Sequence, residues 1–161
     1  MSKRAEVLAQ RIELGAKVLA EFVEGLSEEQ WRAVVKPDGR RVSVVVHHVA
    51  SVYPIEVHLA SEIASGKPVE GVTWDVVADM NAKHALDNAG VSRQETVALL
   101  RSNSHVAAEA VRQFTDEQLD RAGAFSLSAG APVTAQFVIE DHALRHSWHH
   151  LAKIKSALQL S

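Results

Sequence analysis

The histidines near the C-terminal end of the chain are the residues best suited to chemistry. Residues 141–150 read DHALRHSWHH, which places four histidines within nine positions of an apolar pattern with helical spacing. In a helix, His146 and His150 project from the same side, about 6 Å apart along the axis. Two imidazoles in this arrangement can bind one metal ion, as in zinc helices that carry an H-E-x-x-H motif.

A helical wheel separates the inward histidines of this segment from the outward ones. The apolar arc contains Phe137, Ile139, Ala143, Leu144, Leu151, Ile154 and Leu158. His146 and His150 fall on this arc and are predicted to face the core. His142 and His149 fall with the charged residues and are predicted to lie on a solvated face, where they are dispensable.

A third inward histidine is predicted on an earlier helix, residues 43–65. Its apolar arc contains Val45, Val49, Val52, Leu59 and Ile63. His48 lies at the edge of this arc, whereas His47 and His58 point away. Three histidines from two facing helices would leave a coordination position open for water or substrate, which is typical of catalytic rather than structural metal sites.

Other interpretations of the same residues remain open. Hydrogen-bonded histidines in a core would explain the inward positions without a metal. His84 is a spare candidate ligand, and His105 is a surface or packing residue. Glu56 and Glu140 also fall on apolar arcs; they are candidate general bases or partners of the histidines, or else residues near solvent at helix boundaries.

The elements that must position these side chains are helices. Apolar spacing, capping signals and glycines predict helices over residues 4–26, 43–65, 74–89, 92–113 and 134–159. Ser43 is the expected N-cap of the second helix, and Pro54 is expected to kink it. Residues 122–132 are expected to form a loop of small residues, with no strand pair. The prediction is a single all-α domain over residues 1–161, an up-down four-helix bundle with a shorter helix after the second long one.

Composition excludes several classes of function. The 161 residues are 47% hydrophobic and 23% charged, with a net charge of -3 and no cysteine. Disulfides, thiolate metal sites and a cysteine nucleophile are therefore excluded, so a thiol in the reaction would have to be external. The signs of charge are interspersed, which argues against binding to nucleic acid or a membrane surface. We expect no membrane span and no signal peptide, and hence a cytoplasmic protein.

Three segments resemble the DinB-like superfamily of metal-binding bundles, also called YfiT-like metal-dependent hydrolases. They are VVHHVA at 45–50, WDVVADMNAKHA at 74–85 and HSWHHLAKI at 146–154. In the family, one histidine precedes an apolar-alanine step on the second helix, which His48 matches, and two histidines lie four apart on the last. The family often has Gly-Gln where this chain has Ala152 and Lys153.

The resemblance implies a divalent metal, commonly zinc or nickel, held by His48, His146 and His150, and often a homodimer. Some members resemble thiol S-transferases that use bacillithiol or mycothiol. The expected function is metal-dependent thiol transfer to a small molecule, or its hydrolysis, beside an apolar wall of Val52, Ile55, Ala143 and Ile154. The alternative is a non-catalytic bundle that binds a metal or small ligand for sensing or sequestration.

Overall fold

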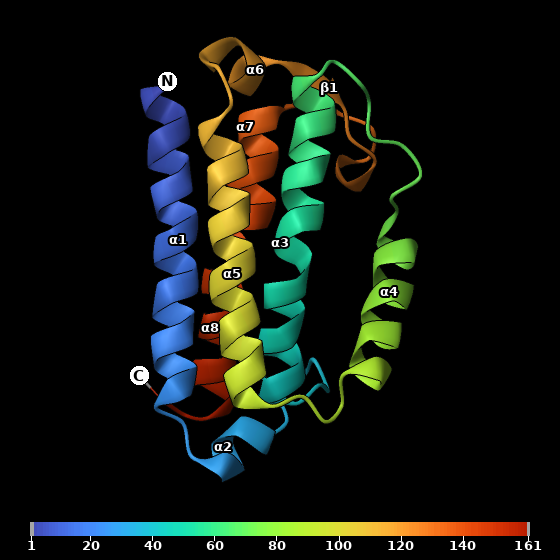
Figure 1. Ribbon diagram of the computed structural model, residues 1–161. Coiled ribbons are helices and arrows are strands. Elements are labelled where there is room, and N and C mark those ends of the chain that lie inside the picture. The colour runs from blue at the N-terminus through green and yellow to red at the C-terminus, as the bar shows by residue number, and fades with distance from the viewer. Residues whose placement is uncertain (1, 161) are drawn as a thin grey trace.

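The computed structural model describes residues 2–160 and shows a bundle of four long helices (Figure 1). Three of them are α1 (Lys3–Glu24), α3 (Val42–Ala64) and α5 (Arg93–Arg112). The fourth consists of α7 (Ala135–Val138), a π-helical segment η2 (Ile139–Leu144) and α8 (Arg145–Ala157). The shorter helix α4 (Trp74–Asp87) follows α3. The predicted all-α four-helix bundle with an additional helix is confirmed.

The direction of the long helices follows from contacts between their ends. Arg112, at the end of α5, pairs with Glu6 near the start of α1 at 3.0 Å, while Arg101 in the middle of α5 pairs with Glu24 at the end of α1 at 2.9 Å, so these helices are antiparallel. Arg121, beyond the end of α5, donates to the carbonyl of Ala64 at the end of α3, at 2.7 Å. α3 and α5 therefore run in the same direction, and α4, on the outer side of α3, returns the chain from the end of α3 towards the start of α5 (Figure 1).

Side-chain caps begin most of these helices as the sequence indicates. Thr73, Ser92 and Thr134 each accept a hydrogen bond from a backbone N–H of the first turn of α4, α5 and α7. The expected cap of α3 is wrong. That helix begins at Val42, and Ser43 lies buried inside its first turn, because the valines that follow draw the whole turn into the core.

The connections between the long helices contain two short helices and a strand pair. The short helices α2 (Glu28–Arg32) and α6 (Asp116–Asp120) close the ends of the bundle, where capping boxes at residues 27–31 and 115–118 predict short turns. β1 (Ala122–Ala124) pairs antiparallel with β2 (Pro132–Thr134), and the one-turn helix η1 (Ser126–Ser128) lies between them. The expectation of no strand pair is therefore wrong. The segment Ala-Gly-Ala has no strand periodicity, and the pair is held instead by the fully buried Phe125 and a bond from Val69 N–H to the Ala124 carbonyl, at 2.9 Å.

α3 is the central apolar helix and continues through Pro54. Among residues 2–160 it is the one helix long and apolar enough to cross a membrane, with a mean hydropathy of 1.2 over the relevant window, of which 61% is buried inside the bundle. The expectation that no apolar run reaches such a length is therefore wrong for α3. Its burial is that of the core helix of a bundle.

The π-helical segment η2 changes the phase of the last helix. A π turn holds about one residue more than an α turn, so residues before it rotate by about 100° relative to the ordinary wheel. Phe137, predicted to face the core, is consequently 43% exposed, while Ala135 and Val138 are buried in its place. Residues after the segment keep the predicted phase.

Candidate metal centre

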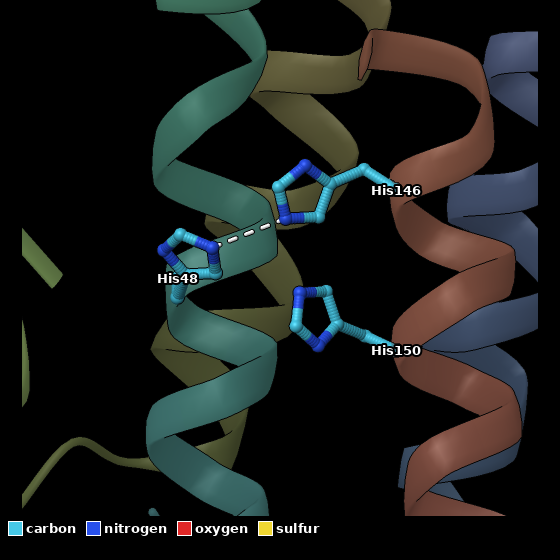
Figure 2. Close-up of side chains that lie close together, drawn as sticks. All are labelled: His48, His146 and His150. Atoms are coloured by element: carbon cyan, nitrogen blue, oxygen red, sulfur yellow. Dashed lines mark hydrogen bonds between the residues drawn. The ribbon is translucent and has the colours of Figure 1, made fainter. Parts of the chain in front are cut away.

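Three of the predicted histidines meet between α3 and α8. His48 projects from α3 towards His146 and His150 on α8 (Figure 2). One ring nitrogen from each residue forms a group whose members all lie within 4.8 Å of one another. The Nε2 atoms of His48 and His146 are 3.1 Å apart, and the rings of His146 and His150 are stacked with centroids 4.8 Å apart.

The donor set fits a divalent metal ion. Two imidazole nitrogens that bind zinc at the usual bond length and a tetrahedral angle lie roughly 3.3 Å apart. The 3.1 Å between the Nε2 atoms of His48 and His146 is close to that value. The same separation also suits a hydrogen bond in which one of these nitrogens carries a proton. Geometry therefore permits a metal site and also a hydrogen-bonded pair of core histidines.

Burial keeps two of the rings neutral. The side chains of His48 and His150 are each only 6% exposed. Burial, with a smaller contribution from neighbouring His146, lowers the pKa of His48 to about 3 and also lowers the pKa of His150. Neutral imidazole is the form that donates a lone pair to a metal, so near neutral pH both rings are in the form that a metal ligand requires.

Glu56 orients the ring of His146. It lies two turns after His48 on α3, is 6% exposed, and its Oε1 accepts a hydrogen bond from Nδ1 of His146. This bond directs the other nitrogen of His146 towards His48, which is the carboxylate–histidine arrangement that supports metal ligands in proteins. Glu56 is therefore a partner of the histidines and not a residue near solvent at a helix boundary.

Glu140 does not join the site. It forms an ion pair with Arg11 of α1 at 2.8 Å, and both side chains are substantially exposed. The wheel placed Glu140 on the apolar arc, but it lies within η2, where the α-helical wheel does not hold. Its charge is therefore neutralised by an ion pair between α1 and the last helix, away from the three histidines.

A cavity of about 420 Å³ adjoins the three histidines, between α3, α4 and the last helix. Its apolar wall includes Val52, Ile55, Leu59, Trp74, Val77 and Met80. Val52 and Ile55 were expected there. Ala143 and Ile154 were expected there too, but both are fully buried in the core and do not line the cavity. α4 supplies the rest of the wall, and no local pattern indicates which face of the bundle this helix covers.

The remaining histidines divide into two groups. His142 is partly buried, with 15% of its side chain exposed; it lines the cavity and meets the ring of Phe125 edge-on. Its prediction as a solvated residue is wrong because η2 turns it inward. His149 is exposed, as predicted, but it also lines this cavity and meets the ring of His150 edge-on, with centroids 5.2 Å apart. His58 and His105 are exposed as well.

His84 forms a separate contact. Its Nε2 lies 2.8 Å from Nδ1 of His47, which joins α4 to α3. The ring of His84 is 5.7 Å from that of His48, centroid to centroid, but His84 is not part of the three-histidine group. His84 therefore helps to hold α4 over the cavity.

Sequence reasoning missed the polar residues at one end of the cavity. Asp38, Arg40 and Lys153 line it together with the histidines. Asp38 and Arg40 belong to a segment whose composition indicates only a turn, and Lys153 is predicted only as a charged residue of the polar face that departs from the family pattern. Their proximity depends on how this turn packs against α8, which local patterns do not encode.

Comparisons with known proteins agree with this fold. The model of the DinB superfamily matches residues 11–154, and the chain therefore belongs to that superfamily. Among solved structures, the chain is similar to YfiT from Bacillus subtilis, described as a probable metal-dependent hydrolase with an unusual four-helix bundle topology. The two are 20% identical, with a TM-score of 0.73 over 100% of this chain and 91% of the other. At this identity the likeness shows a shared fold. No curated protein sequence matches the chain.

Proposed function

We propose that the protein binds one divalent metal ion through His48, His146 and His150 and uses it to activate a nucleophile against a small molecule. The observation that carries this proposal is the convergence of three imidazoles beside an open cavity, two of them deeply buried. Zinc or nickel suits an all-imidazole site. Membership of the DinB superfamily and the described nature of YfiT support the same class of function.

A divalent ion held by three neutral ligands keeps its full charge and lowers the pKa of a thiol or water bound to it. The chain supplies the surroundings. Glu56 fixes the ring of His146, and its second oxygen, Oε2, is buried with no hydrogen-bond partner among residues 2–160. We propose Oε2 as the atom that accepts a proton in the reaction.

The first candidate reaction is transfer of an external thiol to an electrophile. The apolar wall of the cavity suits a partly apolar electrophile and limits the access of competing water. The second candidate is hydrolysis, which the likeness to YfiT favours. A non-catalytic bundle that senses or sequesters a metal or small ligand would use the same histidines without turnover.

Elemental analysis of protein purified without an affinity tag tests the metal site. We expect about one divalent ion per chain, and a sharp loss of metal in His48→Ala, His146→Ala and His150→Ala. His149→Ala is the matched control, because His149 is exposed on the same helix; it should keep its metal. Full metal content in His48→Ala would contradict the three-histidine site.

Activity assays then separate the candidate functions. Metal-loaded protein is incubated with bacillithiol, mycothiol or glutathione and a panel of small electrophiles, beside His150→Ala. Thiol-dependent turnover that His150→Ala lacks supports transfer. Turnover without any thiol supports hydrolysis. Turnover that His150→Ala retains in full would contradict a metal-dependent reaction, and no turnover above background in wild type, with or without a thiol, would leave the binding-only alternative.

A further inference from the structure

Arg40 brings a partly compensated cation to the cavity. Its Nε and Nη2 donate to the two carboxylate oxygens of Asp38 at 2.6 and 2.7 Å, and its side chain is only 16% exposed. The remaining nitrogen, Nη1, is buried and has no hydrogen-bond partner among the residues the structure describes. An unpaired buried N–H is costly, so an acceptor brought by a ligand would be stabilised here.

Lys153 adds a second cation at the same end. It lies on α8, three residues after His150, and lines the same cavity. Within the described part of the chain it forms no ion pair, although its charge acts on Asp38. Asp38 can balance only one of the two cations, so this end of the cavity carries one excess positive charge.

The third cation of the cavity is already balanced. Arg145 pairs with Asp141 at 3.1 Å, and its side chain is largely exposed. The excess charge is therefore localised at Arg40 and Lys153, while the apolar side chains of α4, including the exposed Trp74 and Met80, lie along the cavity wall. A ligand that matches this cavity has an apolar body and one anionic group.

We propose that Arg40 and Lys153 bind a carboxylate of the small molecule that reacts in this cavity. That the bound molecule reacts in the cavity rests on the proposed function, whereas the binding of a carboxylate by these two residues does not. Arginine already held in a fork by one carboxylate is oriented for a second acceptor, and lysine supplies a mobile charge to the same group. The carboxylate can belong to the electrophile or to an external thiol, since thiols such as glutathione carry carboxylates.

Binding of an unreactive acid tests the proposal directly. The probes are 4-phenylbutyrate and its neutral amide, which have the same shape, titrated by calorimetry into metal-free and metal-loaded protein. We expect the acid to bind roughly tenfold more tightly than the amide in both forms of the protein, the usual scale of a charge-assisted hydrogen bond. Lys153→Gln should remove most of that preference and leave binding of the amide unchanged.

Two further variants serve as controls. Arg145→Gln removes a cation of the same cavity that is already paired, and should change binding of the acid by less than about twofold. Arg40→Gln should also abolish the preference for the acid. Because this substitution leaves Asp38 unpaired, the folding of the variant is checked by circular dichroism. If Arg40→Gln does not fold, the result with Lys153→Gln tests the inference.

Three outcomes would overturn the inference. They are equal affinity for acid and amide, an equal loss of acid binding in Arg145→Gln, and loss of acid binding in metal-free protein, which would place the carboxylate on the metal. Metal content is measured separately, so a protein that holds no metal but still prefers the acid would reject the proposed function and support this inference. In turnover assays, the substrate whose half-saturating concentration rises in Lys153→Gln is the one that carries the carboxylate.

Discussion

The interior proline of α3 creates a hydrogen-bonding problem that a neighbouring helix solves. Pro54 has no N–H, so the carbonyl of Ala50, four residues earlier, lacks its usual helical donor. The side-chain amide of Asn103 on α5 donates to that carbonyl at 2.9 Å. We predict that Asn103→Ala destabilises the fold, because it leaves a carbonyl in the middle of the bundle without a partner.

The expected size of the effect follows from the position of the bond. Ala50 is fully buried, and Asn103 is partly buried. An orphaned buried acceptor costs about 1–3 kcal/mol. In a protein of this size, 1 kcal/mol corresponds to about 2–4 °C in melting temperature. Asn103→Ala should therefore lower the melting temperature by roughly 2–12 °C.

A double-mutant cycle measures whether Pro54 is the cause. Pro54→Ala supplies a backbone N–H for the carbonyl of Ala50, so Asn103→Ala should cost much less in that background. The free energy of unfolding is measured by urea denaturation of all four proteins at equal metal content, since a bound metal would itself add stability. Ser102→Ala, at an exposed position of α5, is the control and should change stability by less than about 0.5 kcal/mol.

The result that would refute this reasoning is additivity. If the two substitutions add to within about 0.3–0.5 kcal/mol, Asn103 does not act through the bond that Pro54 leaves unmade. A coupling free energy of about 1 kcal/mol or more would confirm it.

Three other predictions concern the site and the surface. Glu56→Gln keeps the shape of the side chain but removes the charge that supports its histidine partner, so metal affinity should fall about 10–100-fold in a chelator competition assay; unchanged affinity would contradict that role. Arg112 lowers the pKa values of Glu6 and Glu13, so its ion pairs stabilise the fold above the ordinary carboxyl pKa and are lost as the pH falls through the lowered values. The urea midpoint of Arg112→Met should therefore fall below that of wild type at about pH 7 and approach it at about pH 3; a difference independent of pH would count against this. Phe137→Ser should lower the free energy of unfolding, measured by heat or urea, by less than about 0.5 kcal/mol, because η2 turns this ring outward. A loss of about 3–5 kcal/mol, typical of a core phenylalanine, would contradict this placement.

The sequence predicted the three histidines because the relevant patterns are local. His48, His146 and His150 were placed inward by the spacing of apolar residues within their own helices, and that spacing holds in α3 and α8. The structure brings the three rings together as predicted. That they bind a metal stays a prediction.

Features that depend on distant contacts were not predictable in the same way. The bond between Glu56 and His146 joins residues 90 positions apart, and the strand pair is fixed by packing of Phe125 rather than by its own periodicity. The segment that contains Arg40 predicts only a turn, and the position of Arg40 in the cavity depends on how that turn packs against the bundle. His142 was misplaced for a different reason: its sequence contains no mark of a π turn.

The irregularities of the bundle lie beside its candidate site. Pro54 stands two residues before Glu56 on α3, and η2 ends two residues before His146. Each departs from regular α-helix at a cost in hydrogen bonding, and π turns occur frequently at functional sites. A regular helix in place of η2 would keep His146 and His150 inward but turn His142 towards solvent. In α3 the helix continues through Pro54, and the side chain of Asn103 on α5 donates to the Ala50 carbonyl that the proline leaves without a helical donor. Both helices thus lose a regular backbone hydrogen bond at the level where their polar side chains meet, a local departure from the helical rule of the kind that functional sites show.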